Sequence, residues 1–205
     1  MTRPAPARQR LLEAAARLFY ADGVVATGID AITSEAGVAK QSLYNNFASK
    51  DELVLAYIEA RHEEWLGLYR ARLEAASASA SAAGALAPSP REGVLAVFDA
   101  YLDHAESAYE HGFRGCGLLN AAAELPAGAP GREAVRRHKE EVEAILVGHL
   151  AGTGLAPERV ATTAEHLSFL LEGAMSRAGL EGASDRIRHA RRLAAAVLDA
   201  SAGVA

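Results

Sequence analysis

Residues 27–50 read TGIDAITSEAGVAKQSLYNNFASK. The spacing of the apolar residues predicts two short helices, at about residues 29–36 and 40–47. Gly37 lies in the connection between them, where glycine readily adopts the left-handed backbone of a tight turn. A helix-turn-helix needs such a turn, together with apolar side chains that lock its second helix onto the first. The predicted lock consists of Ile32, Ala36, Val38, Leu43 and Phe47.

The second predicted helix has two chemically different faces. On a helical wheel that begins at Lys40, the apolar Leu43 and Phe47 fall together and leave a free polar face opposite them. A short helix with a free polar face is what a reader of the DNA major groove requires. Glutamine and asparagine pair best with adenine, so A·T pairs are expected at the centre of each half-site, which is the stretch of DNA that one such helix contacts. The expected base contacts come from Gln41, Ser42 and Asn45, and Lys40 can reach a base edge or a phosphate.

This segment closely resembles the TetR family of bacterial transcriptional regulators. The resemblance covers about residues 8–55, and a second stretch, residues 115–124 with 136–139 after it, resembles a subset of these regulators. Thr33 stands where the family usually has alanine, and Ala39 replaces the frequent serine that caps the recognition helix. The matching residues are Phe19 and Gly23, Ala26-Thr27, Ile32, Ala36-Gly37-Val38, Leu43-Tyr44, Phe47, Ser49-Lys50 and Leu53.

The resemblance implies how the chain would meet DNA. Tyr44 and Lys50 are expected to touch phosphates, as are Thr27 and the backbone amides from Gly28 onward at the start of the first short helix. Helix N-termini attract anions, and phosphate contacts set the register of a protein on the duplex. A dimer of such chains is expected to bind an operator that is an inverted repeat.

The rest of the chain also follows a helical apolar period and predicts an all-α fold of about nine helices. Residues 1–50 are expected to form a helix-turn-helix DNA-binding domain, and residues 51–205 a ligand-binding and dimerisation domain. Residues 75–90 are almost entirely Ala, Ser, Gly and Pro, and they predict a flexible loop. Further helices are expected at about residues 6–21, from Ser49 as an N-cap, and at 91–111, 117–124, 132–150, 157–180 and 185–200.

Charge and cysteine usage restrict the function classes. The chain has a net charge of −5, but residues 1–50 hold six basic against four acidic side chains, so the basic end is the candidate DNA-binding end. Charged residues interrupt the N-terminal apolar residues, so no signal peptide is predicted and a cytoplasmic protein is expected. The lone cysteine, Cys116, excludes a disulfide framework and is more typical of small packing material than of a redox sensor.

The larger domain is expected to bind a small, largely hydrophobic organic molecule without a metal or cofactor. The alternative is that the residues expected to line this ligand site fill a solid core instead. Asn120 and Glu124 are equally consistent with polar contacts to a ligand and with a pair on the helix surface. Trp65 is better explained as a partly buried interdomain residue than as a ligand contact. The expected lining is Phe98, Tyr101, Leu102, Phe113, Leu119, Val142, Ile145 and Phe169, with Asn120, Glu124, His138 and His166 as polar groups.

The last two predicted helices are expected to form a four-helix dimer interface with a second copy. Paired carboxylates on facing helices, a nucleophile elbow and a phosphate loop are not visible, so the sequence does not support an enzyme. A DNA-binding regulator without a small-molecule ligand is left as an alternative. The expected interface residues are Leu167, Leu171, Met175, Ile187, Leu193 and Val197, with the small residues Ala164, Ser168, Ala174 and Ala194.

Overall fold

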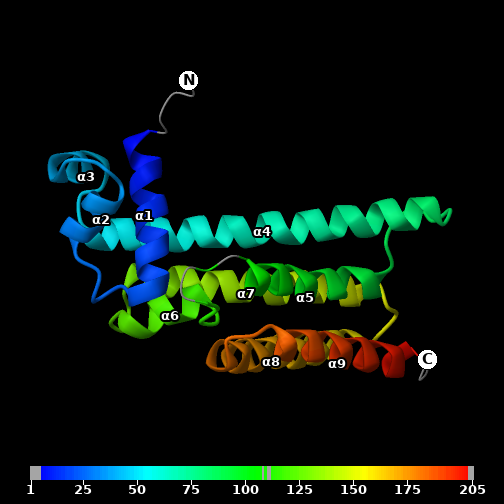
Figure 1. Cartoon of the computed structure of the whole chain (residues 1–205). Helices are drawn as coiled ribbons and strands as arrows, with labels where there is room; N and C mark the ends of the chain where they lie inside the picture. The colour runs from blue at the N-terminus through cyan, green and yellow to red at the C-terminus, as the bar shows by residue number, and fades with distance from the viewer. Residues whose placement is uncertain (1–5, 108, 110–111, 203–205) are drawn as a thin grey trace. The chain divides into compact units, whose positions relative to one another are not determined.

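The computed structural model describes residues 6–107, 109 and 112–202, and these residues form helices without any strand (Figure 1). The prediction of an all-α fold with about nine helices is confirmed. Within the described ranges, no helix is long and apolar enough to cross a membrane. The helices are α1 (Ala7–Asp22), α2 (Ile29–Glu35), α3 (Lys40–Asn46), α4 (Lys50–Ala82), α5 (Pro90–Glu106), α6 (Gly117–Glu124), α7 (Pro130–Ala151), α8 (Pro157–Glu181) and α9 (Asp185–Ala202).

The chain divides into two compact units that do not coincide with the predicted domains. The first unit comprises residues 1–62 and 117–137, and the second comprises residues 63–116 and 138–205. Helices α4 and α7 each contribute to both units, whereas α6 belongs wholly to the first. Residue 111, the predicted end of the fifth helix, lies outside the described residues, and α5 ends at Glu106.

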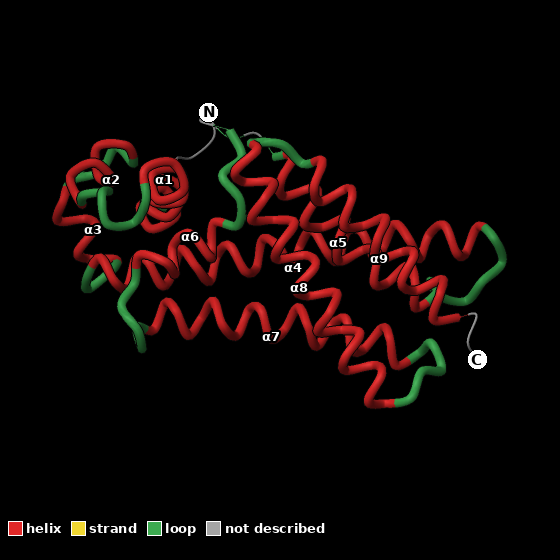
Figure 2. The backbone as a smooth tube through the Cα atoms, turned by 90° about the horizontal axis from the view of Figure 1, so that it is seen from below, coloured by secondary structure: helices red, strands yellow, loops and turns green. Residues whose placement is uncertain are grey.

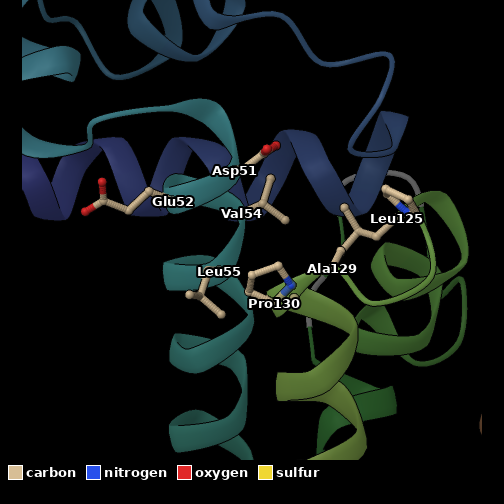
Figure 3. Close-up of a pocket in the computed structure, with 9 residues that line it drawn as sticks. Asp51, Glu52, Val54, Leu55, Leu125, Ala129 and Pro130 are labelled. Atoms are coloured by element: carbon tan, nitrogen blue, oxygen red, sulfur yellow. The ribbon is translucent and has the colours of Figure 1, made fainter.

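In the first unit, α1 packs against α2, α3 and α6 through one apolar face. Leu11, Ala14 and Ala15 have no solvent exposure, and the Phe19 ring meets the edge of Tyr57 from α4 at 5.4 Å. A cavity of about 230 Å³ lies between the start of α4 and the connection from α6 to α7 (Figure 3). The start of α4 and the connection from α6 to α7 are therefore not packed solidly against each other.

Helix α4 continues through most of the segment predicted as a loop. The prediction is wrong for residues 75–82, which are helical, and the connection to α5 covers only residues 83–89. Alanine has the highest helix propensity, and here the serines do not disrupt the helix because they bond back to it. Ser77 Oγ donates to the Leu73 carbonyl at 2.8 Å, and Ser79 Oγ donates to the Ala75 carbonyl at 3.0 Å.

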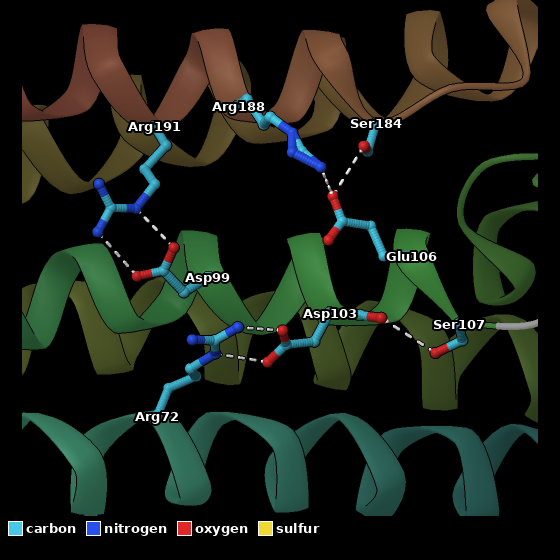
Figure 4. A network of polar contacts seen from close by, with 8 residues as sticks. All are labelled: Arg72, Asp99, Asp103, Glu106, Ser107, Ser184, Arg188 and Arg191. Carbon is cyan, nitrogen blue, oxygen red and sulfur yellow. Dashed lines mark hydrogen bonds and ion pairs between the residues drawn. The ribbon is translucent and has the colours of Figure 1, made fainter.

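In the second unit, α5, α8 and α9 lie side by side (Figures 1 and 2). Helix α5 begins with a capping box, in which Ser89 and Glu92 each accept a hydrogen bond from the other's backbone amide. Three of its four carboxylates face arginines of α4 and α9 (Figure 4). Such partly exposed pairs add little to the free energy of unfolding but favour one register of neighbouring helices. The pairs are Asp99 with Arg191 at 2.5 Å, Asp103 with Arg72, and Glu106 with Arg188.

The apolar stripes of α8 and α9 are buried inside the chain itself. Each of Leu167, Leu171, Met175 and Ile187 is at most 1% exposed, and Ala164, Ala174 and Ala194 are buried beside them. The predicted dimer contact is therefore wrong for these seven buried residues, because they pack into the core of their own unit. For Leu193 and Val197 it stays a prediction. Leu193 and Val197 stay exposed, at 42% and 40%.

Gly179 of α8 lies against the backbone of the segment before α6. A Cβ atom at Gly179 would lie 2.6 Å from the Gly115 nitrogen, and backbone atoms cannot move aside as a flexible side chain can. We expect Gly179→Ala to lower the free energy of unfolding by about 1–3 kcal/mol through overpacking. Urea unfolding measures this change.

Gly148→Ala is the matched control, because Gly148 is also helical and a Cβ there meets nothing within 4 Å. Its expected effect is a gain of up to about 1 kcal/mol from helix propensity. Equal stabilities of the two variants would contradict the close approach at Gly179.

Candidate nucleic-acid interface and ligand site

The connection between α2 and α3 is a tight turn built around Gly37. Gly37 has a φ of 60°, in the left-handed region, and its amide donates to the Ser34 carbonyl at 3.1 Å. The Arg10 guanidinium of α1 donates to the carbonyls of Ala36 and Gly37, both at 3.3 Å. A cation at the carboxyl end of α2 is favourable because the helix dipole places negative charge there. The predicted turn residue is confirmed.

Helix α3 buries one face and exposes the other. Leu43 is 0% and the following Phe47 is 1% exposed, whereas Tyr44 is 46% exposed. Gln41 and Asn45 are exposed as well, and the Gln41 amide donates to Asn45 Oδ1 at 3.1 Å. Both polar side chains therefore lie on one side of α3, one turn apart. Ser42 is half-buried, and its carbonyl accepts a hydrogen bond from Asn46.

Two lysines flank this polar face. Lys40 Nζ lies 2.9 Å from Asp30 Oδ1, and this partner raises the pKa of the Lys40 ammonium group. Lys50 Nζ donates to the Val25 carbonyl at 3.4 Å, in the turn before α2. Both lysines are thus held near the ends of the short helices, where phosphate contacts are expected.

Thr27 is buried in the turn before α2. Thr27 is only 4% exposed, and its hydroxyl lies within donating distance of the carbonyls of Gly23, at 2.6 Å, and Leu18, at 3.3 Å. The Thr27 hydroxyl therefore stabilises the turn, and a phosphate contact of Thr27 stays a prediction. Gly28, exposed and directly before α2, stays a predicted backbone contact.

The comparisons with known proteins agree with this geometry. The profile of bacterial regulatory proteins of the tetR family matches residues 11–57. A TetR-family transcriptional regulator from Streptomyces coelicolor has 34% identity and a TM-score of 0.74, covering 94% of this chain and 95% of that one. The chain belongs to the TetR family of transcriptional regulators. A TetR-type regulator from Streptomyces avermitilis has 30% identity and a TM-score of 0.70, covering 97% and 99% of the two chains.

The curated relatives match this chain over only part of its length. The regulator TtgR of Pseudomonas putida is 41% identical over 64 residues, which are 31% of this chain and 30% of that protein. The matched part is therefore less than a third of that relative's length. The chain is a DNA-binding transcriptional regulator, and its homologues are not enzymes. Regulators of this family bind operator DNA and function as dimers.

The predicted ligand residues fall into three groups. Phe98, Tyr101, Phe113, His138 and Val142 are buried in the second unit. Leu119, Asn120 and Glu124 belong to α6 of the first unit, and Leu119 is 38% exposed. His166 and Phe169 lie on an exposed face of α8. Leu102 and Ile145, also of the second unit, are half-buried. The expectation that all twelve residues line one cavity is wrong for His166 and Phe169, because the buried face of α8 carries Leu167 and Leu171 instead.

A cluster of aromatic and charged side chains surrounds Tyr101 and His138 in the second unit. Trp65 packs against both of them, with ring centroids 5.2 Å and 5.4 Å away. Lys139 Nζ pairs with Glu172 Oε1 at 2.6 Å and donates to the Tyr101 hydroxyl at 3.3 Å. Burial opposes the ammonium charge, but Cys116, Tyr101 and Glu172 outweigh it and raise the pKa of Lys139.

Sequence reasoning missed most of this cluster. Lys139 and Glu172 lie on different helices, so no spacing in the sequence pairs them. Trp65 is expected from the sequence to be partly buried between domains, and the structure buries it to 4% exposure within the second unit. The only available signal was a solitary tryptophan on the apolar face of a long helix.

For DNA binding, we expect the exposed residues of α3 and Lys50 at the start of α4 to act in two ways. Tyr44→Phe and Lys50→Ala should weaken binding to every sequence, and Lys50→Ala should reduce the salt slope by about 1. Gln41→Ala and Asn45→Ala should instead relax base preference, by about 1–3 kcal/mol for each bidentate pairing with a base that the substitution removes. Fluorescence anisotropy with matched and mismatched duplexes at several salt concentrations separates the two effects. A sequence-dependent effect of Lys50→Ala would contradict the assignment.

For stability, we expect a dependence on pH from His149, whose Nε2 lies 2.7 Å from the Tyr69 hydroxyl. Burial lowers the pKa of His149 below its usual value of 6.5, so the folded chain favours the neutral ring. As the pH falls below 6.5, the unfolded chain takes up this proton first, and the free energy of unfolding decreases. Urea unfolding at pH 7.5 and 5.5 should show a smaller decrease for His149→Gln than for the wild type. His189→Gln, at an exposed site, is the control, and equal decreases in all three proteins would contradict the prediction.

Proposed function

We propose that the regulator is a homodimeric repressor that binds an inverted-repeat operator and is released by a small, largely apolar ligand. The observation that carries the proposal is the division of α3 between a buried Leu43 and exposed Gln41 and Asn45. An exposed polar surface on a helix locked in place from behind suits base reading in the major groove.

Two-fold symmetry accounts for the inverted repeat. Two α3 helices related by a two-fold axis read successive major grooves when they lie about 34–36 Å apart. Two equivalent protomers then require two equivalent half-sites of opposite direction. Selection of duplexes from a random pool, followed by footprinting, tests this part of the proposal. A single unsymmetrical site bound by one protomer would overturn it.

The exposed apolar face of α8 and α9 supports dimerisation through these helices. Phe169 and Leu180 of α8 are 64% and 87% exposed, and both belong to the face that α8 turns away from its own core. Leu193 and Val197 are four residues apart on α9 and are exposed too. A second copy that covers this face would remove large apolar side chains from water, at about 25 cal/mol for each Å² buried.

The buried cluster around Trp65 supports a ligand site in the second unit. Trp65 is 4% exposed, and its indole N–H meets no acceptor among the described residues. An unsatisfied buried donor costs free energy that a ligand acceptor could recover. Tyr101, which is in ring contact with Trp65, is 1% exposed, and Phe98 and Val142 of the same unit are at most 2% exposed. Such burial favours a mainly apolar molecule with one polar group.

The alternative is a regulator without a ligand, in which these side chains form a solid core. Thermal-shift screening of apolar compounds, followed by displacement of the selected duplex, distinguishes the two. A compound that stabilises the protein and also releases DNA supports the sensor. No shift and no release across a broad library would overturn the sensor and leave DNA binding intact.

We expect Phe169→Glu to dissociate the dimer, because two carboxylates would be buried at a two-fold apolar interface. Light scattering at micromolar concentration should give a dimer mass for the wild type and a monomer mass for the variant. The control is Leu86→Glu, which changes a fully exposed leucine in the connection between α4 and α5. A dimer mass for Phe169→Glu would contradict the proposed interface.

A further inference from the structure

We propose that Glu124 is a positioning residue for DNA binding, which holds the turn before α2 from a site 99 residues away in the sequence. Its carboxylate, at the end of α6, accepts a hydrogen bond from the Val25 backbone amide at 2.7 Å. The inference rests on DNA binding by the first unit. It assigns Glu124 a role different from the ligand contact expected from the sequence.

The Val25 residue is held by polar contacts on both sides of its backbone. Its amide meets Glu124, and its carbonyl accepts a hydrogen bond from Lys50 Nζ at 3.4 Å. The Val25 side chain is 70% exposed, so apolar packing does little to keep this part of the turn in place. Hydrogen bonds to an ionised acceptor are roughly twice as strong as neutral ones. The Glu124 carboxylate is therefore a main determinant of where the Val25 amide lies.

Gly23 provides the space that this contact needs. A Cβ atom on Gly23 would lie 2.6 Å from Glu124 Oε1. The φ of Gly23, 95°, also disfavours any residue with a side chain at this position. Thr27 ties the same segment together, because its hydroxyl contacts the Gly23 carbonyl at 2.6 Å. The carboxylate thus lies directly against a compact turn, and α2 begins two residues after Thr27.

The two ends of α6 are held differently. At its start, a Cβ atom on Gly117 would lie 3.1 Å from both Tyr20 and Tyr57, so the helix is in close contact with α1 and α4 there. After its end, Leu125 and Val54 line the cavity of about 230 Å³ (Figure 3). Apolar packing therefore fixes the start of α6, while the Glu124–Val25 hydrogen bond fixes its end against the turn.

This arrangement links α6 to the surface that meets DNA. The backbone amides after Gly28 are the predicted phosphate contacts, and they follow the turn that Glu124 holds. A shift of the Val25 amide moves the start of α2, and phosphate contacts depend on such placement. Glu124 acts through Val25 and does not itself touch DNA, since a carboxylate would repel phosphate.

The test compares Glu124→Ala, Glu124→Gln and the control Glu133→Ala. Glu133 is a half-exposed carboxylate of the first unit that pairs with Arg136 on its own helix. The probe is a duplex selected from a random pool by the wild-type protein. We expect Glu124→Ala to bind it about tenfold more weakly, because one charge-assisted hydrogen bond is removed. Glu124→Gln retains an acceptor oxygen and should stay within about threefold of the wild type.

Amide hydrogen exchange supplies the readout that a general decrease in stability would not reproduce. The Val25 amide should exchange faster in Glu124→Ala, while the Gly23 amide, which donates to the Phe19 carbonyl at 3.2 Å, should be unchanged. The proposal is overturned if Glu124→Ala binds the duplex as tightly as Glu133→Ala. It is also overturned if Glu124→Gln is as weak as Glu124→Ala. Failure of the wild type to select any sequence would instead count against the proposed function.

Discussion

Leu43 has no solvent exposure, and the orientation of the DNA-reading surface depends on that burial. Helix α3 has seven residues and no side-chain cap at Ala39, and so short a helix is not stable alone in water. Its direction is therefore set by packing under α1 and α2, through Leu43 and the following Phe47. Once that face is buried, Gln41, Tyr44 and Asn45 have no alternative to pointing outward. The same burial makes the surface rigid, which base reading requires.

The helix-turn-helix could be predicted because all its determinants are local. Gly37 marks the turn, and the apolar spacing of Ile32, Leu43 and Phe47 marks the packed faces, so the two short helices are located to within one residue. The predictions fail where tertiary context decides. An Ala/Ser-rich segment is compatible with loop or helix, and α4 continues through it to Ala82. An apolar stripe shows that one face of a helix is buried, but it does not show which element covers that face. The sequence therefore predicts a second copy against the stripes of α8 and α9, whereas most of their residues pack into the core of their own unit.

At the candidate sites, too, tertiary contacts decide the role of single residues, and the sequence does not show these contacts. Asn120 and Glu124 lie one helical turn apart and are equally consistent with a pocket or a surface pair. Neither interpretation includes the Val25 amide, because a contact across 99 residues leaves no trace in spacing or periodicity. Lys139 and Glu172 are a similar case, since their ion pair joins α7 to α8. Tyr101 and His138 are both predicted as ligand contacts from their sequence positions, and the structure buries both beside Trp65, which the ligand prediction leaves out.

The connection between the two proposed sites follows from chain continuity. Helix α4 carries Lys50 in the first unit and Trp65 in the second, and α7 carries Gly131 in the first and His138 in the second. A helix transmits displacement along its axis because each turn is hydrogen-bonded to the next. A ligand that displaces Trp65 and His138 would therefore act on the two helices that continue into the DNA-binding unit. Only a ligand that prefers one position of these helices can change operator affinity, however tightly it binds. The Glu124 carboxylate keeps the end of α6 attached to the turn before α2, so α6 is a further link of the first unit to this turn.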